Sequence, residues 1–154
     1  MSQIWQIGLI GLVGLCFGSF FNVLIWRLNN ENVPKFWQGR SICPKCRHTL
    51  SWIDNIPLLS FVLLRGRCRY CKKPISWQYP VVELTTALVF VMIGFHPVIL
   101  GIGSAFIVIF FSDLIYGLIP DEMIAAALIL SILGNLSFLG NLVVAAATAR
   151  PFFI

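Results

Sequence analysis

The stretch IWQIGLIGLVGLCFGSFFNVLIW, residues 4–26, decides the class of fold because it contains no charged side chain. A helix needs about 20 apolar residues to cross the hydrocarbon core of a bilayer, and this stretch is long enough. It lacks the basic leading region and the small-residue cleavage site of a signal peptide. We therefore expect a first membrane helix whose N-terminus lies on the outer side of the membrane.

One face of this expected helix carries small residues. Gly14, Gly18 and Asn22 recur every fourth residue, so they lie on the same side of the helix. Small residues let a second helix approach closely, and an asparagine can hydrogen-bond across the contact. The pattern predicts a helix-packing face, and the alternative is that membrane helices are simply rich in glycine.

The composition agrees with a chain that is solvated by lipid. Of its 154 residues 58% are hydrophobic and 11% are charged, and the mean hydropathy is +0.89, whereas a soluble domain is about half apolar and about a quarter charged. Further apolar stretches predict spans near 79–95, 97–119 and 123–139. Pro120 is expected to end the span 97–119. A marginal fifth stretch covers 141–154. We expect an all-α polytopic membrane protein with four to five transmembrane helices.

The charges lie almost entirely in one segment. Residues 27–80 contain ten basic and two acidic side chains, and the rest of the chain contains one basic and four acidic side chains. Basic loops stay in the cytoplasm, so we place this loop there, beside the lipid bilayer. A basic patch also fits nucleic-acid binding. Topology and the negative cytoplasmic leaflet explain the charge, and we expect no nucleic-acid partner.

Two Cys-x-x-Cys motifs lie in the expected loop, residues 27–78. Two such motifs supply the four thiolates of a structural zinc site, and the spacing is slightly longer than the usual four-cysteine pattern. Cytoplasmic thiols stay reduced, which disfavours the alternative of two disulfides. His48 is an alternative ligand, Gly66 favours a tight backbone before the second motif, and Cys16 is expected to be inert packing. The expected Zn²⁺ ligands are Cys43, Cys46, Cys68 and Cys71.

Asp113 is the only acid of the third apolar stretch. A charge near the bilayer centre costs at least about 2.5–3.5 kcal/mol, and such residues are usually functional. Chain direction places Asp113 near the cytoplasmic end of its helix, on the zinc side; the alternative is an interfacial acid without function. Asp121 lies about 12 Å further along a continuous helix, too far for a carboxylate pair. Asp121, Glu122 and Glu83 instead fit helix N-termini, where the dipole favours acids.

Several segments together carry a family resemblance, which extends over residues 8 to about 125. They are Gly18-Ser-Phe-Phe-Asn22-Val-Leu-Ile-Trp-Arg27-Leu, Arg40-Ser-Ile-Cys43-Pro-Lys-Cys46, Leu50-Ser-Trp52-Ile-Asp54-Asn55-Ile-Pro57, Leu64-Arg-Gly66-Arg-Cys68-Arg-Tyr-Cys71, Pro74-Ile-Ser76-Trp-Gln-Tyr79-Pro80-Val-Val-Glu83-Leu and Asp113-Leu-Ile-Tyr-Gly-Leu-Ile-Pro120-Asp121. In these segments the chain resembles the prepilin peptidases, also called type IV leader peptidases.

The resemblance implies a bacterial inner-membrane aspartic endopeptidase. Such a hydrolase cleaves the leader of type IV prepilins, or of type II secretion pseudopilins, at the cytoplasmic face. Many members also N-methylate the new terminus with S-adenosylmethionine, whose binding residues here are not predicted. Asp113 would be the first catalytic aspartate, and the four cysteines would hold the zinc. Residues 1–96 would form the N-terminal domain, and residues 97–154 would form an incomplete peptidase domain.

One departure from the family pattern is serious. The family's second aspartate lies in a Gly-x-Gly-Asp motif, and this sequence has neither that motif nor an aspartate after Asp121. We therefore expect a C-terminally truncated chain that is inactive alone. One alternative is a non-catalytic, membrane-anchored zinc module that binds prepilin or another partner. Another is a symmetric dimer in which two Asp113 side chains meet.

Overall fold

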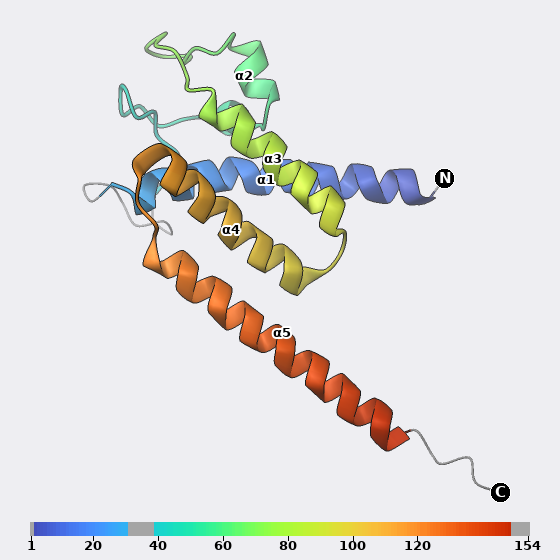
Figure 1. The fold of residues 1–154 in the computed structure, drawn as a ribbon. Coiled ribbons are helices and arrows are strands. Elements are labelled where there is room, and N and C mark those ends of the chain that lie inside the picture. The colour runs from blue at the N-terminus through green and yellow to red at the C-terminus, as the bar shows by residue number, and fades with distance from the viewer. Residues whose placement is uncertain (1, 31–38, 149–154) are drawn as a thin grey trace, which may run out of the picture.

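The computed structural model describes residues 2–30 and 39–148 of the chain, and it describes side-chain environments as far as residue 136 (Figure 1). This part is mostly helical and contains no strand, only the two isolated bridges Ile42–Thr49 and Arg67–Pro74. The expectation of a helical fold is confirmed at this level. The elements are α1 (Ser2–Leu28), the 3₁₀ helix η1 (Trp52–Asn55), α2 (Leu59–Leu63), α3 (Gln78–Ile93), α4 (Pro97–Tyr116) and α5 (Asp121–Thr148).

Helices α1 and α3 pack against each other with their backbones in close contact. A Cβ atom on Gly14 would lie 2.7 Å from the Cα atom of Ala87, and one on Gly18 would lie 2.6 Å from the Cα atom of Glu83. Real side chains do not fit at such distances, so both positions require glycine. The predicted packing face of the first helix is confirmed.

The apolar core lies where α1, α3 and α4 meet. Seven buried side chains form it, and Val82 of α3 and Val108 of α4 are almost completely enclosed. A hydrogen bond of 3.1 Å from Asn29 Nδ2 to the hydroxyl of Ser112 joins the segment after α1 to the last part of α4. The core residues are Phe21, Leu24, Ile25, Val82, Ile107, Val108 and Phe111.

Helix α4 begins as predicted and ends three residues early. Pro97 occupies its first turn, a position where the missing N–H costs nothing. Gly117 follows the last helical residue with φ of 64°, and its N–H bonds to the carbonyl of Asp113. This left-handed cap ends the helix at Tyr116, so the expectation that Pro120 closes a helix reaching Ile119 is wrong.

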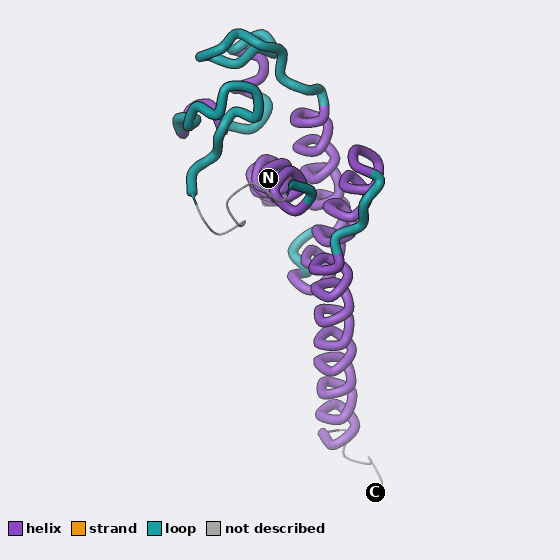
Figure 2. Tube along the Cα trace, turned by 90° about the vertical axis from the view of Figure 1, so that its left-hand side faces the viewer, coloured by secondary structure: helices purple, strands orange, loops and turns teal. Residues whose placement is uncertain are grey.

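Helix α5 is one continuous element, so the expected division near residue 140 is wrong. Glycine in a helix costs about 1 kcal/mol without breaking it, and no proline lies within this helix. Its first half packs on α4, where Gly101 accommodates Leu130 and Gly134 accommodates Val98. Beyond this contact α5 extends away from the other helices (Figures 1 and 2). The expected end of the fifth stretch, 149–154, lies outside the described residues.

Two of the described helices are long and apolar enough to cross a membrane, namely Gln3–Leu28 and Pro97–Tyr116. Helix α3 has 16 residues, which extend about 24 Å at 1.5 Å per residue, less than the hydrocarbon thickness of about 30 Å. Large apolar side chains face outward along these helices, for example Trp5 with 76% and Met92 with 85% of their surface exposed. These surfaces suit lipid better than water.

Candidate functional site

The two Cys-x-x-Cys motifs fold into knuckles of the same design. In the first, the N–H of Cys43 donates to the carbonyl of His48 at 2.9 Å, and the N–H of Arg47 donates to the carbonyl of Cys43 at 2.8 Å. The second motif repeats both bonds around Cys68, at 2.9 and 3.0 Å. The residue after each motif has positive φ, 56° at Arg47 and 59° at Lys72. Each turn thereby directs two thiols to one side.

The four cysteine sulfurs meet at one point. All four lie within 4.8 Å of one another, and none forms a disulfide. A tetrahedral zinc with Zn–S bonds of about 2.3 Å separates its sulfurs by roughly 3.8 Å, so small shifts would close the set around one ion. The donor set therefore fits a metal ion. The cluster consists of Cys43, Cys46, Cys68 and Cys71.

The thiol pKa values of the two buried cysteines differ. Burial raises the pKa of the Cys43 thiol to about 11. Burial acts the same way on Cys68, but the backbone N–H groups of Cys71 and Tyr70 donate to its sulfur, and the pKa falls to about 7. A thiolate is the form that binds metal, and the second knuckle stabilises it near neutral pH.

Asp54 connects η1 to the second knuckle. Its carboxylate accepts hydrogen bonds from the backbone N–H and the hydroxyl of Ser51, at 3.1 and 2.8 Å, and forms a 2.8 Å ion pair with Arg69. Burial raises the pKa of the Asp54 carboxyl, but the hydrogen bonds from Ser51 and Arg69 outweigh it and hold the pKa below its ordinary value. Through its ion pair with Arg69, the ionised carboxylate therefore stabilises the turn that contains Cys68 and Cys71.

His48 lies beside the cysteine cluster without joining it. Its ring stacks on Tyr70, with centroids 3.8 Å apart, and the metal-compatible group contains only cysteines. Gly66 has φ of 66°, and a Cβ there would meet the ring of Phe61 at 3.2 Å, so the predicted tight backbone is confirmed.

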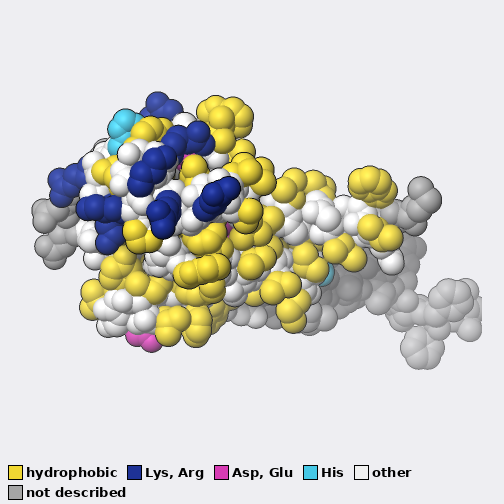
Figure 3. Space-filling view, turned by 90° about the horizontal axis from the view of Figure 1, so that it is seen from above, with side chains coloured by type: hydrophobic (Ala, Val, Ile, Leu, Met, Phe, Trp, Pro, Cys, Tyr) yellow, Lys and Arg dark blue, Asp and Glu magenta, His cyan; other side chains and the backbone are white. Residues whose placement is uncertain are grey.

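Lys and Arg side chains gather over this end of the molecule, whereas apolar side chains cover most of the remaining visible face (Figure 3).

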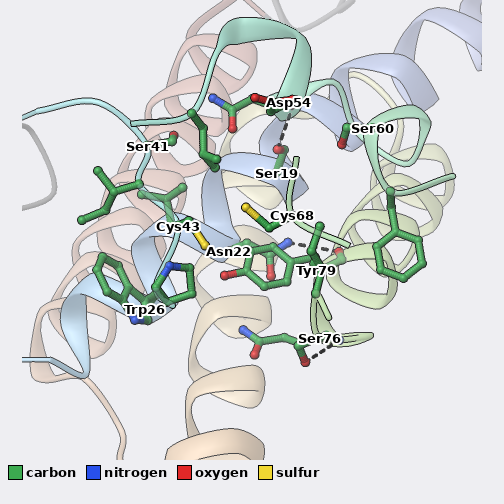
Figure 4. Close-up of a pocket in the computed structure, with 18 of the residues that line it drawn as sticks. Ser19, Asn22, Trp26, Ser41, Cys43, Asp54, Ser60, Cys68, Ser76 and Tyr79 are labelled. Carbon is green, nitrogen blue, oxygen red and sulfur yellow. Dashed lines mark hydrogen bonds between the residues drawn. The ribbon is translucent and has the colours of Figure 1, made fainter. Parts of the chain in front are cut away.

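A cavity of about 630 Å³ separates the cysteine cluster from the helices. Cys43 and Cys68 line it from the knuckles, Asn22 from α1, Tyr79 from α3 and Tyr116 from the end of α4. Figure 4 shows the two cysteine side chains above Asn22 and Tyr79. The metal-compatible cluster therefore forms part of the wall of a partly open cavity that three helices also line.

Glu83 also lines this cavity, and its expected role at a helix N-terminus is wrong. It lies in the second turn of α3, only 6% exposed, and its Oε2 accepts a 2.7 Å hydrogen bond from the N–H of Leu58 in the loop. Leu58 has φ of 57°, and this bond holds it. The partner lies 25 residues earlier in the chain, so helical periodicity could not reveal the contact; burial of a lone acid in an apolar helix was the available signal.

Asp113 lies in the last turn of α4, and its side chain is exposed. Among the described residues its carboxyl has no hydrogen bond or ion pair. Tyr116, three residues later, lines the cavity beside Cys43. The structure thus brings the helix end that carries Asp113 to the same end of the bundle as the cysteine cluster, without placing Asp113 in the cavity.

Comparison with known families identifies this arrangement. A profile of the bacterial peptidase A24 N-terminal domain matches residues 12–96, which contain both knuckles, the cavity-lining part of α1 and all of α3. The chain belongs to the prepilin leader peptidase family. The four cysteines, Asn22 and Glu83 all lie within the matched region.

Curated relatives agree with this family. The chain is 52% identical over 79 residues to the prepilin leader peptidase/N-methyltransferase of Myxococcus xanthus, a match that covers 51% of this chain and 23% of the relative. It is 34% identical over 173 residues to that of Aeromonas hydrophila, covering 90% and 59%. It is 33% identical over 159 residues to that of Pectobacterium carotovorum, covering 86% and 57%. The chain thus spans less than two thirds of each of these relatives. No solved structure matches the chain.

Proposed function

We propose that this chain takes part in the processing of type IV prepilins or type II secretion pseudopilins at the inner face of a bacterial cytoplasmic membrane. Family membership supports this class of substrate. The single observation that carries it is the cavity between the cysteine cluster and α4, because Tyr116 at the end of that helix and Cys43 line the same space. A bound peptide there would lie close to both.

The proposed membrane arrangement follows from the charges. The loop between α1 and α3 carries most of the basic side chains (Figure 3), and such loops stay in the cytoplasm. The N-terminus of α1 would then lie outside, and the end of α4 inside. Residues 1–96 would act as the metal-bearing, prepilin-binding domain, and 97–154 as part of a peptidase domain.

Zinc is the metal we propose for the cysteine cluster. Four thiolates suit a closed, structural Zn²⁺ site. When bound, the ion would fix the two knuckles relative to each other. The ion would have a structural and not a catalytic role, because four protein ligands leave no open coordination position for a reacting group.

Asp113 is proposed to supply one carboxylate of an aspartic peptidase pair. Such hydrolysis uses two carboxylates that share a proton, one activating water while the other donates to the carbonyl. The exposed carboxyl at the end of α4 can be reached by a second carboxylate and by substrate. N-methylation of the processed terminus with S-adenosylmethionine is proposed from the activity in the relatives' names.

A second candidate function is a membrane-anchored metal module that binds prepilin without cutting it. The observation that favours it is that the exposed carboxyl of Asp113 forms no ion pair and belongs to no metal-compatible group within residues 3–30 and 39–136. In that case the cavity and the knuckles would present prepilin to another protein.

A cleavage assay distinguishes these functions. Purified protein in lipid nanodiscs is mixed with a prepilin, alongside Asp113→Asn and the control Glu122→Gln, which alters an exposed acid at the start of α5. Leader removal that is lost in Asp113→Asn and kept in Glu122→Gln supports the peptidase. Prepilin binding without cleavage in all three proteins supports the module. Cleavage that survives in Asp113→Asn would contradict the role proposed for that carboxyl.

A further inference from the structure

Two buried polar groups in the cavity have hydrogen-bonding capacity that the described protein does not use. They are the side-chain oxygen of Asn22 on α1 and the carboxylate of Glu83 on α3. We propose that they bind the α-ammonium group of a peptide N-terminus inside the cavity. This inference rests on the proposed function, because removal of a leader exposes such a terminus.

Asn22 presents an acceptor that needs a donor. Its Nδ2 donates to the carbonyls of Gly18 at 3.2 Å and Tyr79 at 3.1 Å. Carbonyl oxygens only accept, so these two bonds fix which way the amide points. Its Oδ1 is then left buried without a partner, in a side chain that is 1% exposed. An unsatisfied buried acceptor costs about 1–3 kcal/mol, which an entering N–H group would recover.

Glu83 presents a buried carboxylate that forms no ion pair within the part of the chain that the structure describes. Its Oε2 accepts a hydrogen bond from the N–H of Leu58, and the hydroxyl of Ser19 donates to the carbonyl of Asn55. Two carboxylate oxygens offer about four acceptor positions, so capacity remains. Among the described residues the one ion pair joins Arg69 to Asp54, and Glu83 has none. A buried carboxylate calls for a cation or a proton, and an ammonium group supplies both charge and donors.

Aromatic and basic side chains line the rest of the cavity, and the basic ones are Arg27, Lys45, Arg69 and Lys73. Aromatic side chains line it from three helices, including Trp26, Tyr79 and Tyr116. Such rings attract an alkyl ammonium through their faces and pack against an apolar first side chain. A volume of about 630 Å³ falls in the range of sites that hold small ligands or a short peptide segment.

The donor requirement distinguishes an ammonium from the other cation that this family's methylation chemistry would bring, a methylsulfonium. A sulfonium centre carries no N–H and cannot satisfy the Oδ1 atom of Asn22. A primary ammonium carries three N–H donors and can bond to Asn22 and Glu83 together. These two acceptors therefore fit an ammonium group better than a sulfonium centre.

The test uses the full chain in lipid nanodiscs and measures binding alone, so it needs no cleavage. The probes are a short apolar peptide with a free α-amine and the same peptide N-acetylated, both labelled at the C-terminus. We expect the free-amine peptide to bind at least about tenfold more tightly. Glu83→Gln keeps an oxygen for the Leu58 N–H but removes the charge, and it should bring the ratio close to one. Glu122→Gln should keep the wild-type ratio.

Three results would overturn the inference. The first is equal binding of the two peptides by the wild type. The second is a preference that Glu83→Gln leaves unchanged while its metal content shows an intact fold. The third is loss of S-adenosylmethionine binding in Glu83→Gln with peptide binding unaltered. A protein that cleaves prepilin yet shows no amine preference would refute this site and leave the proposed function standing. An amine preference without cleavage would support this site and contradict the proposed peptidase activity.

Discussion

The side-chain amide of Asn22 lies 3.1 Å from the carbonyl oxygen of Tyr79 and donates a hydrogen bond to it. This bond connects the C-terminal part of α1 to the first turn of α3, directly after the segment that follows the second knuckle. Gly18, one turn before Asn22, lets the two backbones approach for it. The helix packing and the metal-compatible module are therefore joined at one point, and the cavity lies there.

Gly18→Ala should destabilise the protein. The new methyl group would lie 2.6 Å from the Cα atom of Glu83, so the helices must separate, at about 1–3 kcal/mol for overpacking. Thermal unfolding in detergent measures the effect. The matched control is Gly8→Ala, because no atom lies within 4 Å of a Cβ there. Equal melting temperatures for the two variants would show that the close contact does not stabilise the fold.

Removal of one cluster thiol should abolish metal binding. Cys68→Ser replaces a buried ligand whose sulfur lies with the other three, and three ligands leave the site open. Elemental analysis of protein purified without chelator should find one zinc per chain in the wild type and almost none in the variant. Cys16→Ser, which alters the exposed cysteine of α1, should keep the metal. Full zinc content in Cys68→Ser would place the metal elsewhere.

Asp54→Asn should destabilise the protein near neutral pH and much less in acid. The bonds from Ser51 and Arg69 hold the pKa of the carboxyl below its ordinary value, so folding favours the ionised form. That contribution is complete above the unfolded pKa of about 3.9 and disappears as the pH falls through the lower folded pKa. Hydrogen bonds to a charged group contribute about 1.5–3 kcal/mol.

Denaturant unfolding at several pH values measures this difference. The gap between wild type and Asp54→Asn should narrow steadily as the solution is acidified. Asp121→Asn, an exposed acid of α5, serves as the control and should show a small gap at every pH. A gap for Asp54→Asn that is independent of pH would mean that packing, not ionisation, explains the loss.

Ser112→Ala should loosen the contact between the segment after α1 and the end of α4. Ser112 is completely buried and accepts a 3.1 Å hydrogen bond from Asn29. Its loss leaves a polar group of Asn29 without that partner, at a cost of about 1–3 kcal/mol. Thermal unfolding compares it with Ser131→Ala, an exposed position on α5. An unchanged melting temperature in Ser112→Ala would rule out a stabilising role for this bond.

The sequence predicted the features that depend on local spacing. Gly14, Gly18 and Asn22 share a helix face by periodicity alone, and the structure has α3 packed on it. The two Cys-x-x-Cys motifs were enough to predict a four-cysteine cluster, because each motif directs two thiols to one side. The identity of the metal and the catalytic role of Asp113 stay predictions.

The features that depend on contacts between distant segments were not predicted. Glu83 was assigned to a helix N-terminus because it stands near the start of an apolar stretch. Its partner is the N–H of Leu58, which lies 25 residues earlier in the chain and could not be found from local spacing. The cavity between the knuckles and the helices was equally hidden, since it exists only when α1, α3 and α4 meet. Glycine is typical of helix C-caps, so Gly117 could have predicted the early end of α4. The helix was instead expected to continue to Ile119, because Pro120 was taken as the residue that ends it.

The central claim is that the cysteine cluster and Asp113 lie on the same side of the membrane. Reporter fusions in cells test it most directly, with a phosphatase that is active only outside and a fluorescent protein that matures only in the cytoplasm, each joined after Lys73 and after Gly117. We predict fluorescence and no phosphatase activity at both positions. Fluorescence at one position with phosphatase activity at the other would contradict the account.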